Sequence, residues 1–472
     1  MIKRIIFGIA VFCSWLSCFS QDVDVLKFEE YLGYVKLYHP FVKQANLLVS
    51  EGQAKLMKAR GTFDPKLEID FDRKKFKSTE YYDKLNATFK IPTWFGIELK
   101  GNFQENTGVF LNPEGSLPKD GLYSAGVSIP VAKGFLINKR MASLRQAKLF
   151  REQVLAERQL AVNTILYDAS IAYFSWLKAF NDLQVYATFV NNAQIRLDGV
   201  KKNFEVGEIP AIDTLEARII LNNRKLEHEK ARIAYVKSSL ELSNYLWLDN
   251  NIPIEIQDNV IPDANTYNTV DETLKTSGLN IQNFTVENHP KLRALNLKYR
   301  SQKIERRLKL NNLLPQINLE YNFLSETPEQ INSFNTTNYK SGVRVNFPLF
   351  LRKERGNLKL AKLKLNDTEF EIANTRVSLK NKFDALTREI NSYAEQNNLT
   401  RVIIDDYLKL LKAEERKFNL GESSLFLINS RESKLIETKL KANEIENKFF
   451  KVKAKIFQLI NFDTQQKLNS KS

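Results

Sequence analysis

The residues best suited to chemistry in this chain are few and scattered. They include three histidines, His39, His228 and His289, and two adjacent carboxylate pairs, Asp405-Asp406 and Glu414-Glu415. General acid–base catalysis needs such groups to converge in one pocket, but adjacent residues on a helix point in different directions. His39 and His289 each precede a proline, which favours a helix-start role over metal ligation. The sequence contains no cysteine–histidine cluster, phosphate loop or nucleophile motif, so we expect no enzyme, no cofactor and no metal site.

The chain repeats one plan twice. His39-Pro40 and His289-Pro290 are each followed, 25 residues on, by Pro65 and Pro315. Matched features continue in both copies: alternating runs at Leu67, Ile69, Phe71 and at Ile317, Leu319, Tyr321, then Phe204 with Gly207-Glu208 and Phe418 with Gly421-Glu422. Such internal similarity indicates a duplicated helix–strand–strand–helix unit.

Two long segments between these motifs predict very long helices. Residues 135–198 and 357–420 contain neither glycine nor proline. Their apolar residues recur at helical spacing, as expected for helices packed side by side in a coiled-coil-like wall. Each ends at a glycine-bearing break, after which a second helix follows, at about 211–248 and 425–460. Asp213, Ser423 and Ser424 could cap these second helices, so each break predicts an αα-hairpin.

Strand signals precede each long helix. Period-two alternation predicts strands at about 65–75 and 121–131 in the first copy and at about 315–324 and 338–347 in the second. An extra pair is expected in the first copy, at about 85–91 and 96–105. Aromatic residues gather near the expected strand ends: Tyr81, Tyr82, Trp94, Phe95, Phe347 and Phe350. They would suit either a membrane-interface girdle or an ordinary sheet.

The N-terminus reads as a secretory signal. Met1 to Arg4 is basic, residues 5–16 are apolar, and small or polar residues run to Ser20, where we place cleavage. Cys18 leaves a lipoprotein alternative open, although Trp15-Leu16-Ser17 fits a lipobox poorly. The formal charge is +15, but export argues against nucleic acid as a partner, and the interleaved lysines and glutamates indicate solvated helix faces.

The strands predict a membrane protein assembled from several chains. No later segment has roughly 18 consecutive apolar residues, but alternating strands of about 9–11 residues suit a transmembrane barrel. Four or six strands cannot close one alone, and lipid forbids an open edge. Strands from several chains must therefore close together, and a ring of copies would also bury the long helices.

The chain resembles the TolC-like family of outer-membrane efflux and secretion channels over nearly the whole mature sequence. The resemblance rests on the duplicated order of elements and on the following segments: Leu313-Leu314-Pro315-Gln316, Phe347-Pro348-Leu349-Phe350, Asn203 to Gly207, Lys417 to Gly421, and the strand-to-helix joints at 122–148 and 352–362. It implies an α+β membrane protein, a homotrimer whose β-barrel in outer-membrane lipid continues into a long periplasmic α-helical barrel. It also implies a passive conduit coupled through a periplasmic adaptor (membrane fusion) protein to an inner-membrane pump of RND or ABC type.

The resemblance also assigns roles to residues at the two breaks. The adaptor-docking tips would be Val206, Gly207, Glu208, Leu420, Gly421 and Glu422. The candidate pore entrance comprises Asp213, Phe426, Leu427 and Ser430. The best-known family members carry acidic residues six and nine positions after the tip glycine. The six-position match in the first repeat is Asp213, whereas the second repeat has Leu427 and Ser430 at these positions. An apolar constriction at Leu427 could replace the acidic ring.

The expected organisation has four parts. Residues 1–20 are the signal peptide, 21–250 the first repeat (long helix about 137–203, tip 204–210), 251–275 a connector in which Ile252, Ile254 and Ile256 suggest a strand, and 276–472 the second repeat (long helix about 355–418, tip 419–424). The function expected is an outer-membrane channel for tripartite efflux or type I secretion. The alternative is a secreted or periplasmic coiled-coil scaffold without pore activity.

Overall fold

The fold is described by a computed structural model that covers residues 24–274, 285–329 and 336–460. The predicted signal peptide, its cleavage near Ser20 and Cys18 lie outside the described residues. The chain divides into two compact units. One comprises Met1–Gln44, Ala161–Phe284 and Asn381–Ser472, and the other comprises Ala45–Leu160 and Thr285–Lys380. We call them the hairpin unit and the sheet unit.

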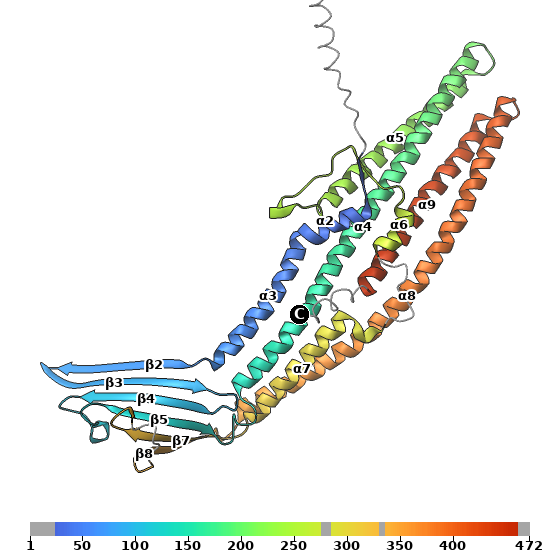
Figure 1. The fold of residues 1–472 in the computed structure, drawn as a ribbon. Coiled ribbons are helices and arrows are strands. Elements are labelled where there is room, and N and C mark those ends of the chain that lie inside the picture. Colours follow the sequence, from blue (N-terminus) through green and yellow to red (C-terminus); the bar gives the residue numbers. More distant parts are fainter. Residues whose placement is uncertain (1–23, 275–284, 330–335, 461–472) are drawn as a thin grey trace, which may run out of the picture. The chain divides into compact units, whose positions relative to one another are not determined.

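The sheet unit holds one six-stranded antiparallel sheet (Figure 1). Its strands are β2 (Lys66–Phe76), β3 (Thr79–Pro92), β4 (Glu98–Thr107), β5 (Leu122–Pro130), β7 (Gln316–Ser325) and β8 (Tyr339–Asn346), in the spatial order β2-β3-β4-β5-β7-β8. The extra strand pair of the first repeat therefore joins the sheet. Pairing of β5 with β7 unites the two repeats in one sheet.

Helices adjoin the sheet within the same unit. They are α3 (Pro40–Arg60), α7 (Pro290–Asn311) and the first parts of α4 (Lys139–Glu205) and α8 (Arg352–Asn419). Buried Ile137, Met141 and Ala142 pack against Trp94. The Asn311 amide donates to the Ile137 carbonyl at 2.9 Å, which ties α7 to the start of α4.

The hairpin unit is built from two helical hairpins, α4–α5 and α8–α9, with α5 at Ala211–Ser243 and α9 at Leu425–Ile460. Both hairpins point the same way (Figure 1). Its core is aromatic: Phe28, Tyr31, Tyr173, Phe174, Trp176 and Phe450 are all at most 2 % exposed. Phe28 and Tyr31 come from α2 (Phe28–Tyr38). The Tyr173 hydroxyl donates to the Leu26 carbonyl at 2.8 Å, so this ring both fills the core and fixes the N-terminal segment.

Both His-Pro motifs start helices in the same manner. The backbone N–H groups of Phe41 and Lys291 donate to Nδ1 of His39 and His289, at 3.2 and 3.1 Å. In the first repeat this motif also breaks the opening helix into α2 and α3, because proline cannot continue a hydrogen-bonded helix. The histidines thus act as helix N-caps, and among the described residues no group of three or more His, Cys, Asp or Glu could hold a metal.

The connector differs from the expected strand at Ile252–Ile256. That segment forms only an isolated bridge, Trp247 with Pro253. The strand lies further on, where β6 (Val260–Pro262) pairs in parallel with β1 (Asp24–Leu26). A short helix, α6 (Thr266–Thr273), follows. Within the described part of the chain, no helix is both long and apolar enough to cross a membrane.

Candidate functional site: the two-faced sheet and the hairpin ends

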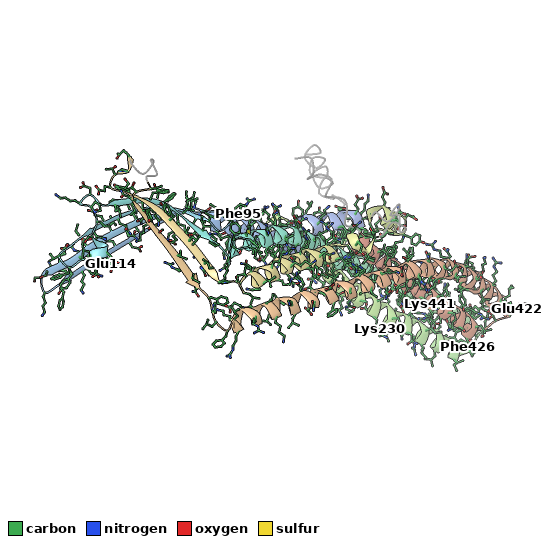
Figure 2. All side chains as sticks on the ribbon, turned by 90° about the horizontal axis from the view of Figure 1, so that it is seen from below. Phe95, Glu114, Lys230, Glu422, Phe426 and Lys441 are labelled. Carbon is green, nitrogen blue, oxygen red and sulfur yellow. The ribbon has the colours of Figure 1, made fainter. Side chains whose placement is uncertain are left out.

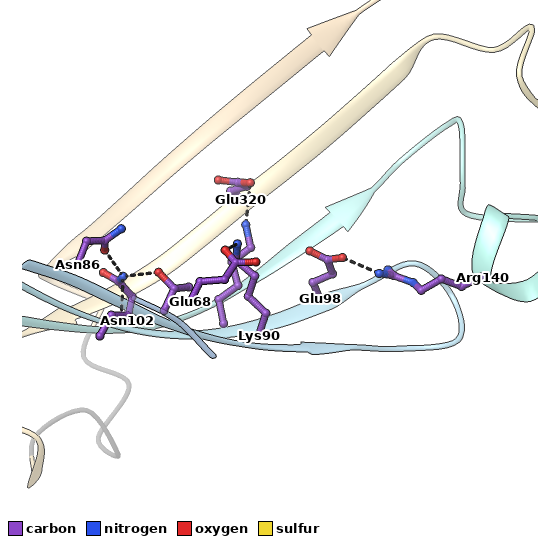
Figure 3. Close-up of polar contacts among 10 residues, drawn as sticks. Glu68, Asn86, Lys90, Glu98, Asn102, Arg140 and Glu320 are labelled. Atoms are coloured by element: carbon purple, nitrogen blue, oxygen red, sulfur yellow. Dashed lines mark hydrogen bonds and ion pairs between the residues drawn. The ribbon is translucent and has the colours of Figure 1, made fainter. Parts of the chain in front are cut away.

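One face of the sheet is polar and internally bonded (Figure 3). The Lys100 Nζ donates to Glu320 Oε1 at 3.0 Å, from β4 to β7. Lys90 pairs with Glu68 across β3 and β2. The Asn102 amide donates to Asn86 Oδ1 at 2.6 Å and to Thr88 Oγ1 at 2.8 Å, and Arg140 Nη1 donates to Glu98 Oε1 at 2.8 Å. These groups alternate in sign along the surface, so this face is hydrophilic without a large net charge.

The opposite face is apolar. The register places the following residues on it: Leu67, Ile69 and Phe71 of β2, Leu85, Ala87 and Phe89 of β3, Leu99 and Phe103 of β4, Val127 of β5, Leu319 and Tyr321 of β7, and Val343 and Val345 of β8. Phe71 is 60 % exposed and Val343 is 68 % exposed. A monomeric soluble protein rarely exposes a continuous apolar patch of this extent, so this face needs a nonaqueous surrounding.

Aromatic and apolar side chains stand at the ends of the strands. Phe95 (labelled in Figure 2), Leu349 and Phe350 are 55 %, 84 % and 74 % exposed at the end where the strands join helices. The Arg352 guanidinium lies 5.3 Å from the centre of the Phe350 ring. At the other end, Tyr81 packs against Phe110 with ring centres 4.8 Å apart. Such amphipathic ends suit a boundary between apolar and aqueous surroundings.

The two hairpin ends have the same backbone geometry. Gly207 and Gly421 have φ of +80° and +76°, the left-handed conformation that favours glycine. Gly207 N–H donates to the Phe204 carbonyl at 3.0 Å and Glu208 N–H to the Asn203 carbonyl at 2.9 Å. The same pair recurs from Gly421 to Phe418 and from Glu422 to Lys417, at the same distances. Both ends are Schellman motifs, which satisfy carbonyls that a helix C-terminus leaves free.

The predicted tip residues are exposed at these turns. Val206 and Leu420 are 70 % and 74 % exposed, at matched positions before the glycines. Glu208 and Glu422 are also exposed, and Figure 2 shows Glu422 at the end of its hairpin. A Cβ added at Gly207 or Gly421 would meet nothing within 4 Å. Each turn therefore presents an apolar residue, a glycine and a carboxylate to solvent.

The four predicted pore-entrance residues lie on two different helices. Asp213 is in the first turn of α5, whereas Phe426, Leu427 and Ser430 belong to α9. Phe426 is 68 % exposed and Leu427 is 39 % exposed. Their role at a pore entrance remains a prediction.

Of the expected capping residues, Ser424 caps α9 as predicted, whereas Asp213 and Ser423 do not cap a helix. Pro210, and not Asp213, is the N-cap of α5 and has no side-chain cap bond. Ser424 accepts weakly from Leu427 N–H at 3.4 Å. Ser423 instead donates to Glu414 Oε1 at 2.6 Å, and this bond, with the nearby Arg431, lowers the pKa of the Glu414 carboxyl. Proline can start a helix because its missing N–H costs nothing there.

Sequence reasoning missed a buried ion network between the hairpins, which we call the Glu432 network. Glu432 of α9 is 0 % exposed, and Arg196 Nη1 of α4 donates to its Oε2 at 2.5 Å. Arg224 Nε of α5 lies 3.9 Å from Oε1, and Arg224 also donates to Ser433 Oγ at 2.9 Å. A signal was present: Glu432 follows Ile428 by four residues and precedes Leu435 by three, so it occupies the apolar face of its helix.

Comparisons with known proteins agree with this geometry. A family model described as outer membrane efflux protein matches residues 283–428. The outer membrane channel CmeC of Campylobacter jejuni is similar over 94 % of this chain and 88 % of its own, with 13 % identity and a TM-score of 0.65. VceC of Vibrio cholerae is similar over 92 % of this chain and 95 % of its own, with 11 % identity and a TM-score of 0.64. No curated protein matches the chain in sequence.

The identities to solved channels are low, so these likenesses establish the fold. The family match falls on the second repeat, including its strands, its long helix and the Gly421 turn. The expected TolC-like fold, with long helices and antiparallel strands, is confirmed. Residues 283–428 match the outer membrane efflux protein family model, and the whole chain has the fold of solved outer membrane channels.

Proposed function

We propose that three copies of this chain form a water-filled conduit through the outer membrane, fed from the periplasm by a partner system. The copies act as a passive channel of a tripartite efflux or type I secretion system. A periplasmic adaptor couples them to an inner-membrane pump of RND or ABC type, which supplies the energy. An N-terminal signal cleaved near Ser20 would deliver the chain to this location.

The observation that carries the proposal is the two-faced sheet. Its apolar face suits the hydrocarbon of the outer membrane, since exposed Leu67, Ile69 and Phe71 would bury their side chains in lipid. Its polar face, with Lys100, Glu320 and Asn102 bonded across strands, suits a water-filled lumen. In lipid an open sheet leaves edge N–H and C=O groups without partners, at several kcal/mol each. Closure by further copies removes that cost.

The helices support the same oligomer. On α5 an exposed apolar residue recurs at every seventh position: Ile212, Ile219, Leu226, Ile233 and Leu240, between 47 % and 69 % exposed. On α8, Leu399, Val402 and Leu410 form a second exposed apolar strip. A seven-residue repeat is the pattern of a coiled-coil seam. In a ring, the α5 strip of one copy would pack on the α8 strip of the next.

The hairpin ends are the natural contact for the adaptor. Both hairpins end in the same Schellman turn, with Val206 and Leu420 exposed beside Glu208 and Glu422. We assign adaptor docking to these residues together with Gly207 and Gly421. Asp213, Phe426, Leu427 and Ser430, which follow the turns, would line the entrance. The second repeat carries Leu427 and Ser430 at the positions where acidic residues would lie, so Leu427 would narrow the pore by apolar contact.

Membrane fractionation and planar-bilayer recording test the proposal. The expected result is recovery in the outer membrane, a trimer mass by light scattering in detergent, and discrete conductance steps. The coiled-coil scaffold without pore activity remains the rival hypothesis. Recovery as a soluble periplasmic monomer, or absence of conductance from a verified trimer even with Gly421→Arg at the tip, would favour that scaffold. A cross-link captured in cells from Glu208 or Glu422 would identify the adaptor.

A further inference from the structure

The two edge strands of the sheet are not covered by other parts of the described chain. Every residue of β2 and of β8 is exposed. Proteins protect edge strands with charged side chains, proline, bulges or covering segments, and of these both β2 and β8 carry charged side chains. β8 contains no proline, and β2 is regular until a register shift between Lys74 and Lys75. Residues 66–72 and 339–346 therefore offer two long, unpaired edges.

The six strands alternate in direction, so β2 and β8 run antiparallel to one another. A β8 placed beside the β2 of another copy continues the antiparallel pattern. The apolar side chains of both edge strands also lie on the same face of the sheet, for example Ile69 on β2 and Val343 on β8. A head-to-tail ring of identical copies thus preserves both the antiparallel order of the strands and the apolar face of the sheet.

The register inside the sheet limits how two copies can meet. Following paired residues straight across the sheet leads from Lys66 to Lys90, Lys100, Gly126, Asn322 and finally Lys340. The start of β2 is therefore level with the start of β8. Because the two strands run in opposite directions, they overlap only if the next copy is displaced along the strand. Such displacement is the stagger that a closed barrel requires.

Barrel geometry restricts the displacement to two values. Side chains keep their faces only for even displacements. With a rise of about 3.3 Å per residue and a strand spacing of about 4.8 Å, displacements of four, six and eight residues per six strands give tilts of about 25°, 35° and 43°. Membrane barrels tilt by about 35–45°. Only the displacements of six and eight residues give a tilt within this range.

Charge decides between these two displacements. On the polar face β2 carries Glu68, Asp70 and Asp72, and β8 carries Lys340 and Arg344 on either side of Gly342. A displacement of six residues places Arg344 opposite Glu68 and Lys340 opposite Asp72. A displacement of eight residues places Lys340 opposite Lys74, and like charges directly opposite are destabilising.

We infer that β8 of one copy pairs with β2 of the next in the six-residue register, with Gly342 opposite Asp70. This inference rests on the proposed function. Gly342 has no side chain and meets nothing within 4 Å where a Cβ would lie. Asp70 can therefore reach toward both Lys340 and Arg344, which are its diagonal neighbours in this register. Three copies of the six-stranded sheet then form a barrel of 18 strands.

Cysteine cross-linking between β8 of one copy and β2 of the next tests this register directly. The only native cysteines are Cys13 and Cys18, within the predicted signal segment. The full-length protein carrying Gly342→Cys is combined in turn with Glu68→Cys, Asp70→Cys or Asp72→Cys. Directly opposite residues lie about 4.5–5.5 Å apart and can form a disulfide, whereas diagonal neighbours at about 7–8 Å cannot without backbone movement.

The expected result is a reducible ladder of dimers and trimers for Asp70→Cys with Gly342→Cys, at least tenfold stronger than for the other two pairs. Single-cysteine variants are the controls. A dominant ladder from Asp72→Cys with Gly342→Cys would overturn the inference in favour of the eight-residue register. A verified trimer that forms no ladder with any pair would also overturn it while leaving the channel intact. A monomer in detergent would instead contradict the proposed function.

Charge reversal provides a second test without cysteines. Glu68→Lys with Asp72→Lys should weaken the trimer against heating in detergent, because in the six-residue register it places lysines opposite Arg344 and Lys340. Adding Lys340→Glu with Arg344→Glu should restore most of the lost resistance. If each double variant destabilises the trimer and their combination is no more resistant to heating than either, then β2 and β8 of neighbouring copies do not meet.

Discussion

Arg196 of α4 donates to the carboxylate of Glu432 of α9 at 2.5 Å, and this carboxylate is completely buried. The contact joins the α4–α5 hairpin to the α8–α9 hairpin. The other carboxylate oxygen, Oε1, has Arg224 Nε as its nearest cation, at 3.9 Å, and no hydrogen bond. One buried negative charge is thus shared by two arginines that are themselves 13 % and 15 % exposed.

Replacing Glu432 by glutamine should loosen the contact between the hairpins. The substitution keeps the side-chain size but removes the buried counter-charge shared by Arg196 and Arg224, leaving Arg196 with only the more exposed Glu415 at 3.8 Å. Breaking a buried pair from one side costs about 3–5 kcal/mol, so we expect a local loss of about 2–4 kcal/mol for these partly exposed arginines. Hydrogen exchange of amides in residues 190–200 and 428–436 measures this opening free energy.

The matched control for that experiment is Glu415→Gln. Glu415 lies 3.8 Å from Arg196 but is 44 % exposed, and exposed pairs contribute less than about 1 kcal/mol. Equal changes in exchange for the two variants would mean that the buried position of Glu432 has no special effect.

The hairpin glycines allow turn geometry to be separated from contact with a partner. Gly421 has φ of +76°, which costs most L-residues about 1–2 kcal/mol. Gly421→Ala should increase amide exchange around residues 417–422, whereas Gly421→Asn should change it less, since asparagine tolerates this conformation. If alanine and asparagine behave alike, backbone strain is not what this position controls.

Much of this fold could be anticipated from residue patterns, and the exceptions have physical causes. Alternation in residues 66–72 and the absence of glycine and proline from 357 to 420 mark a strand and a helix, because both patterns are local. Pairing of β5 with β7 joins segments about 190 residues apart, and alternation carries no information on which strands pair. For the same reason, alternation alone did not reveal whether the extra strands at 79–107 join the sheet.

The candidate site also contains some residues that a local pattern predicts and others that only tertiary packing reveals. Gly207 and Gly421 were predictable because a left-handed turn after a helix favours glycine. Asp213 could have capped α5, but the helix begins at Ala211 with Pro210 as its N-cap. The spacing of Glu432 from Ile428 and Leu435 indicates a buried position, but its pairing with Arg196 depends on packing between hairpins, which no local pattern encodes.

His39 should make the protein less stable in mild acid. Burial lowers the pKa of its imidazole, although a hydrogen bond with the Asn244 backbone acts in the opposite direction. The unfolded value is about 6.5, so the native state binds fewer protons just below that pH. The stabilising contribution is complete above pH 6.5 and is lost as the pH falls through the lower native pKa.

The variant His39→Asn tests this pH dependence. Asparagine can accept the same N-cap hydrogen bond from Phe41 N–H but does not titrate. The urea midpoint of the native protein should fall more between pH 7 and pH 5 than that of the variant. His228→Asn is the control, since His228 lies within α5 and not at a His-Pro helix start. Parallel curves for native protein and His39→Asn would exclude His39 as the source.

The apolar strip on α5 should be needed for assembly and not for folding of one chain. Ile219 and Ile233 are 52 % and 58 % exposed, so Ile219→Glu with Ile233→Glu should change single-chain stability by only about 0.5 kcal/mol per site. In a coiled-coil seam, however, each glutamate would be buried against an apolar neighbour without a partner charge. We therefore expect normal helix content by circular dichroism and a monomer by light scattering in detergent. Lys225→Glu, exposed on the same helix but about a third of a turn around it from Ile219 and Leu226, should still assemble. A trimer of unchanged thermal resistance from the double glutamate variant would place the contact between copies elsewhere on the helices.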